Sequence, residues 1–365
     1  MKRNIFLTLL IIFFSISAYA QKKSTASAVT ENEFKFKPLT ELKATSVKNQ
    51  SRTNTCWCFA TTSFIESELL RMGKGEYDLS EMYIVRHNYS DRLKDNYLRQ
   101  GKGNTDEGGQ SHDWMKIFAE SGIVPDEIYD GLNYGSPTHN HGEMNSFLKA
   151  LAETAVERKN ESPQYKSIVE SLLDTYLGTV PESFTYKGVI YTPKTFAQSL
   201  GINPDDYIEI TSMTHFPFYT MGILEVPDNW RMKSFYNVPV NELIEIMDYA
   251  LNNGYTVNWD GDVSEPGFTH KKGVALFPEP AVSQEMRQKG YENFTTTDDH
   301  LMHVTGISND QNGIKYYITK NSWGPESNSF GGYLNMSENY VRAKTLFIMV
   351  HKNSIPPAIR AKLGI

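Results

Sequence analysis

The sequence predicts an α+β fold with two lobes. Its 365 residues, 39% of them hydrophobic and 22% charged, are enough to bury a real core, which excludes a disordered tail. Segments with helical spacing come first, whereas short, aromatic, alternating runs dominate after residue 255. Because helices precede the sheet along the chain, we expect two lobes with a cleft between them.

Residues 1–20 have the pattern of an export signal. Lys2 and Arg3 supply the positive end, residues 5–14 an apolar stretch, and residues 18–20 (AYA) a cleavage site. A retained membrane anchor is the alternative, but the apolar stretch is shorter than the roughly 20 residues needed to cross a bilayer. We therefore expect an exported protein, periplasmic or secreted, without a stable membrane anchor.

The rest of the chain divides into segments that differ in composition and in residue pattern. Residues 21–40, rich in Lys, Ser, Thr and Ala without a sustained period, are expected to form a flexible leader. Residues 41–365 are expected to form one domain. Within it we expect a mainly helical lobe (41–235), a mainly β lobe (236–350) and a C-terminal tail (351–365).

Five segments carry helical spacing, and a glycine stands where several of them would stop. They are residues 56–73, 112–121, 144–159, 165–178 and 241–252. The predicted strands are residues 255–259, 272–277, 300–307, 315–321 and 331–337. The first predicted helix therefore begins at Cys56.

Charge and cysteine content exclude some functions. The chain has 36 Lys and Arg against 43 Asp and Glu, a net charge of −7, so nucleic acid is not an expected partner. The only cysteines, Cys56 and Cys58, are separated by one residue and are poorly placed to bond to each other. Their role is therefore chemical or incidental.

Cys56 is a candidate nucleophile. A thiol at a helix N-terminus lies near unsatisfied N–H groups and aligned peptide dipoles, which stabilise the thiolate. The alternative is a small buried hydrophobic residue, a common role for free cysteine. Cys58 points to another face of the helix, and we interpret it as structural.

A thiolate that attacks a carbonyl also needs a base, a group that orients the base, and donors for the oxyanion. Gln50 lies six residues before Cys56, in a loop that can fold its amide beside the thiol. The run DDHLMHVTG supplies imidazoles at the start of a predicted strand, and KNSWG supplies Asn321 at the end of the next.

These residues together resemble the motifs of the papain-like cysteine peptidases. Further segments are similar to the bleomycin hydrolase and aminopeptidase C branch of that family. They are LSE (79–81), DEGGQ (106–110), GIVP (122–125), WDGDV (259–263) and the ending RAKLGI (360–365). The resemblance covers roughly residues 42–365 and implies a papain-like fold: a helical lobe with an insertion, an antiparallel β lobe, and the active site in the cleft between them.

The resemblance also implies roles. Cys56 would be the nucleophile, Gln50 an oxyanion donor, and Asn321 the residue that orients the catalytic histidine. His300 matches the family pattern of His-x-Met with a glycine six positions later, and His303 does not. Since positions three apart on a strand face opposite sides, only one of the two can face the cleft. We assign His300 as the base and His303 as structural, with His303 as the alternative base.

Four further residues acquire expected roles in substrate binding. Trp323 would shield the bond between His300 and Asn321 from water. By the resemblance, Gly108 and Gly109 would form a flat wall for an extended substrate backbone, although an ordinary tight turn explains them as well.

Ile365 would place the terminal carboxylate in the cleft, where it would pair with a substrate's α-ammonium. The implied activity is that of an aminopeptidase acting on peptides with a free N-terminus.

Other readings of these motifs stay open. On the same triad, the chain could be a thiol acyltransferase, an endopeptidase or a catalytically silent peptide-binding homologue. We expect no metal and no cofactor: neither Asp298, Asp299, His300 and His303 nor His139, His141 and Glu143 have the spacing of a zinc hydrolase.

Two departures from the family bear on assembly and on the site. The family usually has a small residue where this chain has Cys58, and the chain is shorter than is usual in the group. A homo-oligomer is possible.

Overall fold

The computed structural model describes residues 34–365, and Lys35–Ile365 form one compact unit. The predicted signal peptide (1–20) and residues 21–33 of the predicted leader lie outside the described residues. The helices are α1 (Cys56–Arg71), α2 (Glu81–Leu98), α3 (Ser111–Ser121), α4 (Gly142–Arg158), α5 (Pro163–Leu177), α6 (Pro193–Leu200), α7 (Val240–Asn252), α8 (Gln284–Glu292), α9 (Glu338–Lys344) and α10 (Pro357–Leu363).

The strands are β1 (Lys37–Glu41), β2 (Phe184–Tyr186), β3 (Val189–Tyr191), β4 (Tyr207–Thr211), β5 (Met221–Ile223), β6 (Ser234–Asn237), β7 (Val257–Gly261), β8 (Phe268–Thr269), β9 (Val274–Ala275), β10 (His300–Asn309), β11 (Lys315–Lys320), β12 (Tyr333–Ser337) and β13 (Thr345–His351). β2 and β3 form a separate hairpin, and the other eleven form one sheet. Its order is β5-β6-β4-β13-β7-β10-β11-β12-β9-β8, with β1 paired to β10. Most pairs are antiparallel, as expected, but β4–β6 and β9–β12 are parallel.

Apolar side chains on the two faces of this sheet enter two different cores. One core joins Leu301 and Phe347 to residues of α1 through α6. The other joins Trp259 and Met302 to residues of α7, α9 and α10. Because neighbouring residues of β10 face opposite ways, Leu301 and Met302 belong to different cores. The sheet therefore has helices on both faces.

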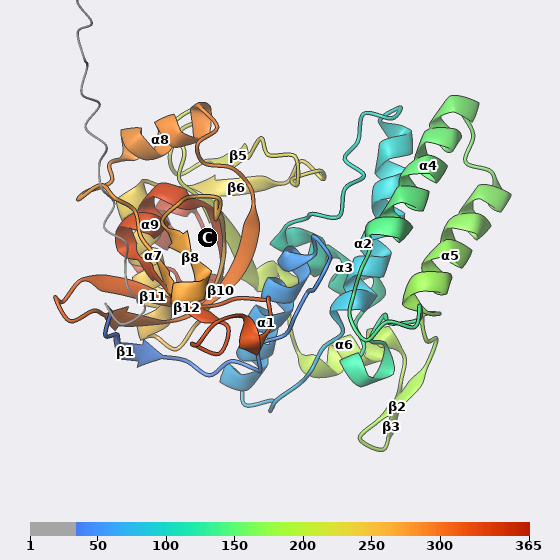
Figure 1. The fold of residues 1–365 in the computed structure, drawn as a ribbon, viewed down its shortest axis with the longest axis horizontal. Coiled ribbons are helices and arrows are strands. Elements are labelled where there is room, and N and C mark those ends of the chain that lie inside the picture. Colours follow the sequence, from blue (N-terminus) through green and yellow to red (C-terminus); the bar gives the residue numbers. More distant parts are fainter. Residues whose placement is uncertain (1–33) are drawn as a thin grey trace, which may run out of the picture. The chain divides into compact units, whose positions relative to one another are not determined.

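Helix α1 is central, because it packs against β10 of the sheet and against α2 and α3. Nearly all of its residues are buried. Figure 1 shows α2, α4 and α5 on the side of α1 that faces away from the eleven-stranded sheet. The arrangement brings the first residue of α1, Cys56, to the boundary between helices and sheet.

The structure differs from the sequence analysis at two of the predicted segment boundaries. Residues 37–41, the first four of which belong to the predicted leader (21–40), form β1, which pairs with β10. Strands β4, β5 and β6 precede or span residue 235 and belong to the main sheet, which therefore draws on the predicted helical lobe as well. Of the residues that the structure describes, none lie in a helix long and apolar enough to cross a membrane.

Candidate active site

Cys56 is the first residue of α1, as predicted, and its side chain is buried. The backbone N–H of Leu301 on β10 donates a hydrogen bond to its sulfur. Leu301 follows His300, the first residue of β10. The start of the helix and the start of the strand therefore meet at the sulfur, and the residue assigned as base is next in the chain to the sulfur's hydrogen-bond donor.

The surroundings of Cys56 favour the neutral thiol. Burial raises its pKa to about 12; the Leu301 N–H lowers it in part, and the carboxyl groups of Asp260, Asp228 and Asp298 raise it further. Burial and nearby acids thus oppose the stabilisation of the thiolate that the helix N-terminus is expected to give. A base that takes the proton as the sulfur attacks would offset this opposition.

His300 and Asn321 are hydrogen bonded, as the sequence predicts: His300 Nε2 and Asn321 Oδ1 are 2.8 Å apart. The backbone N–H of Ser322 donates to the same oxygen at 2.7 Å, which identifies this atom of the amide as the acceptor. The ring nitrogen Nε2 must then carry a hydrogen, so Nδ1 is the nitrogen that can accept a proton. Burial lowers the pKa of His300 to about 4, so the ring is neutral at pH 7.

A second histidine, His270, holds the other end of the Asn321 amide. Ser327 Oγ donates to the Gly324 carbonyl at 2.6 Å, so it accepts from His270 Nε2 at 2.8 Å. Nδ1 of His270 is then an acceptor, and Asn321 Nδ2 donates to it at 3.3 Å. Burial lowers the pKa of His270 to about 4, which keeps the ring neutral. The sequence analysis missed this residue, because no motif marks it.

Trp323 covers both histidines. Its ring centroid is 4.9 Å from that of His300, at an angle of 33°, and 4.8 Å from that of His270, at 76°. Trp323 itself is half-buried, so its ring lies between the His300–Asn321 bond and solvent. The position agrees with the shielding role expected from the sequence.

Gln50 is buried beside the Asn321 strand end. Its backbone N–H donates to the Ser322 carbonyl at 2.8 Å, and its side-chain Oε1 accepts from Ser322 Oγ at 2.7 Å. One N–H of its Nε2 donates to the Thr53 carbonyl at 2.8 Å. Because the Thr53 carbonyl can only accept, it identifies the nitrogen of the Gln50 amide, which faces the loop that leads to Cys56. The second N–H of this nitrogen is the one left for an oxyanion.

Gly108 and Gly109 are both needed for packing. A Cβ on Gly108 would come within 1.9 Å of Asp228 Oδ2, and one on Gly109 within 2.9 Å of the Trp57 indole. The Trp57 Nε1–H also donates to the Glu107 carbonyl at 3.1 Å, which holds this segment against the start of α1. The structure thus gives both glycines a packing role, and their role as a wall for substrate stays a prediction.

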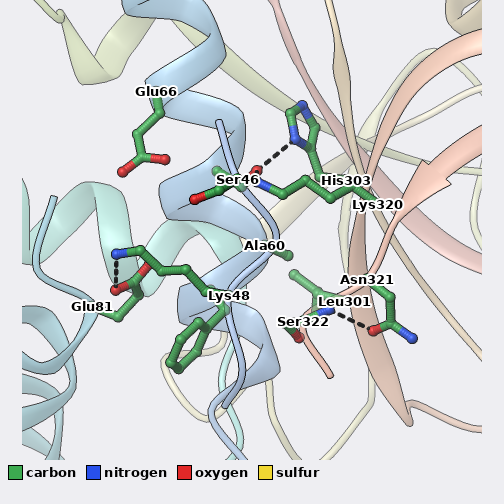
Figure 2. Close-up of a pocket in the computed structure, with 12 residues that line it drawn as sticks. Ser46, Lys48, Ala60, Glu66, Glu81, Leu301, His303, Lys320, Asn321 and Ser322 are labelled. Carbon is green, nitrogen blue, oxygen red and sulfur yellow. Dashed lines mark hydrogen bonds and ion pairs between the residues drawn. The ribbon is translucent and has the colours of Figure 1, made fainter. Parts of the chain in front are cut away.

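His303 points away from the His300–Asn321 pair. Its Nδ1 is 2.8 Å from Ser63 Oγ on α1, and Lys320 Nζ donates to the same hydroxyl at 2.7 Å. These residues line a small, partly open pocket of about 20 Å³, and Figure 2 shows the His303 ring and the Asn321 side chain apart from each other in its lining. His303 thus joins β10 to α1, which fits its assigned structural role.

Cys58 also has a structural environment. It is fully buried, and its thiol donates to the Glu81 carbonyl at 3.2 Å, at the start of α2. Burial raises its pKa well above the usual value. Cys58 therefore links α1 to α2.

The C-terminal tail packs on the sheet lobe. Ile359 and Leu363 of α10 belong to the core that contains α7, and Ile365 packs against that core. The ammonium of Lys362 lies 2.6 Å from Glu242 on α7. The contacts that the structure shows for the tail are thus with α7, and a position for the Ile365 carboxylate among Cys56, His300 and Asn321 stays a prediction.

The two histidine sets weighed as metal sites have other partners. His300 bonds to Asn321, and His141 Nδ1 is 2.9 Å from the Tyr89 hydroxyl. Within residues 34–365, no group of three or more His, Cys, Asp and Glu side chains is arranged to hold a metal ion.

Comparisons with known proteins agree with this geometry. A model described as the Peptidase C1-like family matches residues 85–364, a range that contains His300 and Asn321 but begins after Cys56. "Cysteine proteinase 1, mitochondrial" of Saccharomyces cerevisiae is 22% identical over 90% of this chain and 79% of its own length. "Aminopeptidase E" of Lactobacillus helveticus is 23% identical over 86% of this chain and 82% of its own.

A solved structure has the same fold. PepW from Lactobacillus rhamnosis superposes with a TM-score of 0.72 and 18% sequence identity, over 90% of this chain and 84% of the other. The papain-like α+β fold expected from the sequence is therefore confirmed.

Proposed function

The chain belongs to the Peptidase C1-like family of cysteine peptidases, and from that premise we propose that it is an aminopeptidase that removes residues from the free N-terminus of peptides. The observation that carries the chemistry is the hydrogen-bonded set of His300, Asn321 and Ser322 under Trp323, together with the bond from the backbone of Leu301, the residue after His300, to the Cys56 sulfur. Relatives named aminopeptidase support the choice of substrate class.

In the proposed reaction, His300 Nδ1 takes the proton of the Cys56 thiol as the sulfur attacks the peptide carbonyl. Nε2 keeps its hydrogen and donates it in a hydrogen bond to Asn321 Oδ1. This bond orients the ring and stabilises the imidazolium that forms. The imidazolium then gives its proton to the leaving amine, and the acyl-enzyme remains. His300 next removes a proton from water, and the attack of that water releases the acid and restores the thiol.

The oxyanion of each tetrahedral intermediate needs donors. We assign this role to the free N–H of Gln50 Nε2 and to the backbone N–H of Cys56, the first residue of α1. Such preorganised donors are worth about 2.7–4 kcal/mol each in acyl transfer. The Ser322 hydroxyl supports the arrangement, since it fixes the Gln50 amide from its oxygen end.

The test is cleavage of aminoacyl coumarin amides, with free and with N-acetylated amines, by wild type, Cys56→Ala and the matched control Cys58→Ala. We expect wild type and Cys58→Ala to cleave the free amines, and Cys56→Ala to be inactive. Iodoacetamide should label wild type and Cys58→Ala at residue 56. Equal activity in Cys56→Ala would refute the proposal.

The same assay separates the alternatives. An endopeptidase would prefer acetylated peptides to free amines. A thiol acyltransferase would form new amides when a second amine is added, and a silent binding protein would cleave none of the substrates although iodoacetamide still reacts.

We also propose that residues 1–20 direct export and are removed before Gln21. The charge and apolar pattern of that segment supports this. N-terminal sequencing of the protein purified from its native source should begin at Gln21, and an intact Met1 would contradict export by cleavage. Gel filtration of the same material gives the state of assembly, for which we propose a homo-oligomer.

A further inference from the structure

Two carboxyl groups lie against each other beside the candidate nucleophile. The side chains of Asp260 on β7 and Asp298, in the segment before β10, are close enough to share a hydrogen bond when one of them is protonated. Asp260 is fully buried, whereas Asp298 is partly exposed. Of the two side chains, only that of Asp298 is therefore in contact with solvent.

This pair is short of hydrogen-bond donors. Both carboxylate oxygens of Asp260 are buried without a donor, among the residues that the structure describes. Gln110 donates its Nε2–H to Asp298 at 3.2 Å, but its own Oε1 is also buried and unpartnered. A fourth such atom is Oδ1 of Asn258, which stands two residues before Asp260 on the same face of β7. Buried acceptors without donors are rare in proteins and call for an explanation.

A shared proton explains only part of this arrangement. Burial and then the neighbouring carboxyl group raise the pKa of Asp260 well above its usual value, and burial raises that of Asp298 to about 7, so the pair can hold one proton between them. One proton satisfies one oxygen of Asp260 and leaves the other oxygen and Gln110 Oε1 without a donor. A primary ammonium brings three N–H donors and a positive charge, which matches the deficit.

The pair also lies where a substrate would pass. Asp260 is directly opposite Leu301 in the sheet, and the Leu301 N–H is bonded to the Cys56 sulfur. The carboxyl groups of Asp260 and Asp298 act on the Cys56 thiol through their charge. Gln110 follows Gly109 directly, so the same site borders the Gly108–Gly109 segment that the sequence assigns to substrate binding.

We propose that Asp260, Asp298 and Gln110 form the site that binds an ammonium group of the peptide substrate. This inference rests on the proposed peptidase function and adds the residues that select its substrates. Two sources can supply the group: the α-ammonium of the residue before the cleaved bond, or the ε-ammonium of a lysine one residue further from that bond. Both use the same acceptors, and substrates distinguish them.

The experiment compares wild type with Asp260→Asn, Asp298→Asn and the control Asp205→Asn, which removes an exposed carboxylate from the turn before β4. The substrates are coumarin amides of leucine, N-acetyl-leucine, N-acetyl-lysyl-leucine and N-acetyl-leucyl-leucine. Iodoacetamide labelling of Cys56 reports the thiol separately, because this neutral reagent needs no ammonium site.

For an α-ammonium, Asp260→Asn and Asp298→Asn should lower kcat/KM for leucine coumarin amide by roughly 10- to 100-fold, the worth of one charged hydrogen bond. Labelling by iodoacetamide should not fall, nor should any cleavage of N-acetyl-leucyl-leucine coumarin amide that wild type shows. A lysine side chain is the bound group if wild type cleaves N-acetyl-lysyl-leucine coumarin amide, as an endopeptidase would, and the two variants lose that activity instead. Asp205→Asn should match wild type throughout.

Equal losses on charged and neutral substrates, or none on either, would overturn the proposal. Thermal melting curves of each variant show whether such a loss reflects unfolding. If wild type and Cys56→Ala cleave nothing, the peptidase function itself fails, which is a different result from an active enzyme that is indifferent to Asp260→Asn.

Discussion

At the scale of single residues, a series of hydrogen bonds fixes which atoms of the site carry protons. The Ser322 N–H fixes the oxygen of Asn321, Asn321 fixes the hydrogen of His300 on Nε2, and the Ser327 hydroxyl fixes the tautomer of His270. Each step follows from counting donors and acceptors. The result leaves His300 Nδ1 as the free base in the resting protein.

His270 is therefore predicted to be a positioning residue. In His270→Ala the Asn321 amide loses the acceptor of its Nδ2 and can rotate, so kcat should fall by about fivefold, the worth of a neutral hydrogen bond of ~1 kcal/mol. KM should stay unchanged, because His270 acts through Asn321. Steady-state kinetics on an aminoacyl coumarin amide measure both constants, and His270→Gln, which keeps an acceptor, should restore part of the rate. A rise in KM with kcat constant would contradict this role.

Asp298 should make stability depend on pH. Its pKa is raised to about 7 by burial first and by Asp228 next, above the unfolded value of about 3.9. The folded state therefore binds the proton more tightly, and this contribution to stability is present below about pH 4 and is lost as the pH rises through about 7.

Replacing the carboxyl group of Asp298 by an amide should remove this loss of stability at high pH. The melting temperature of Asp298→Asn should thus exceed that of wild type by a few degrees at pH 8, about 2–4 °C per kcal/mol for a chain of this size, and by less at pH 5. Thermal melts at the two pH values test this, with Asp205→Asn as control. A difference in melting temperature between Asp298→Asn and wild type that decreases as the pH rises would contradict the raised pKa of Asp298.

At the scale of elements, the site depends on how α1 is held against β10. Ser63 on α1 contacts both His303 on β10 and Lys320 on β11, and all three are buried. On the opposite side, Cys58 bonds to the start of α2. These contacts set where the first residue of α1, Cys56, meets the first residues of β10.

Ser63→Ala should destabilise the protein. It leaves His303 Nδ1 and one N–H of Lys320 buried without their partner, which costs about 1–3 kcal/mol. Urea denaturation followed by tryptophan fluorescence measures the free energy of unfolding. The control is Thr154→Ala on the exposed face of α4, where the lost hydroxyl bonds only to Ala150 and the change should be small. An unchanged stability would mean that the cavity supplies other partners.

At the scale of the whole molecule, the tail and the acid pair are two separate candidates for recognising a free N-terminus. The tail packs against α7, and its last core residue is Leu363. Asp260 and Asp298 lie on the side of the sheet that faces α1, since Asp260 shares the face of Asn258, which bonds to Thr61. A truncation can therefore separate the two.

Deleting residues 364–365 tests the tail and keeps Leu363 in place. If the Ile365 carboxylate binds the substrate amine, the deletion should reduce cleavage of leucine coumarin amide and raise cleavage within longer acetylated peptides. Mass spectrometry of the peptide products measures both. The control is Lys362→Ala, which removes an exposed contact with Glu242 and leaves the chain end intact. Unchanged products after truncation would assign the recognition to the acid pair alone.

Local signals in the sequence determined much of this protein. Helix starts and strand alternation predicted the elements, and the motifs around Gln50, Cys56, His300 and Asn321 carried the family resemblance that implied the papain-like fold and the His300–Asn321 bond. Strand alternation showed that only one of His300 and His303 can face the cleft, and the family pattern of His-x-Met with a later glycine selected His300. The order of elements fixed the α+β class without any knowledge of their packing.

Only the tertiary structure decided the environment of those residues. Asp260, Asp298 and Gln110 come from three distant segments. Each lies in a motif noted in the sequence, but no motif shows that their side chains meet, and His270 is likewise recognised only by its place against Asn321. The pKa of Cys56 depends on burial and on acids far away in the sequence, which a helix start alone does not reveal. The burial of a residue and the charges around it depend on the whole fold, so a short segment of the sequence does not reveal them.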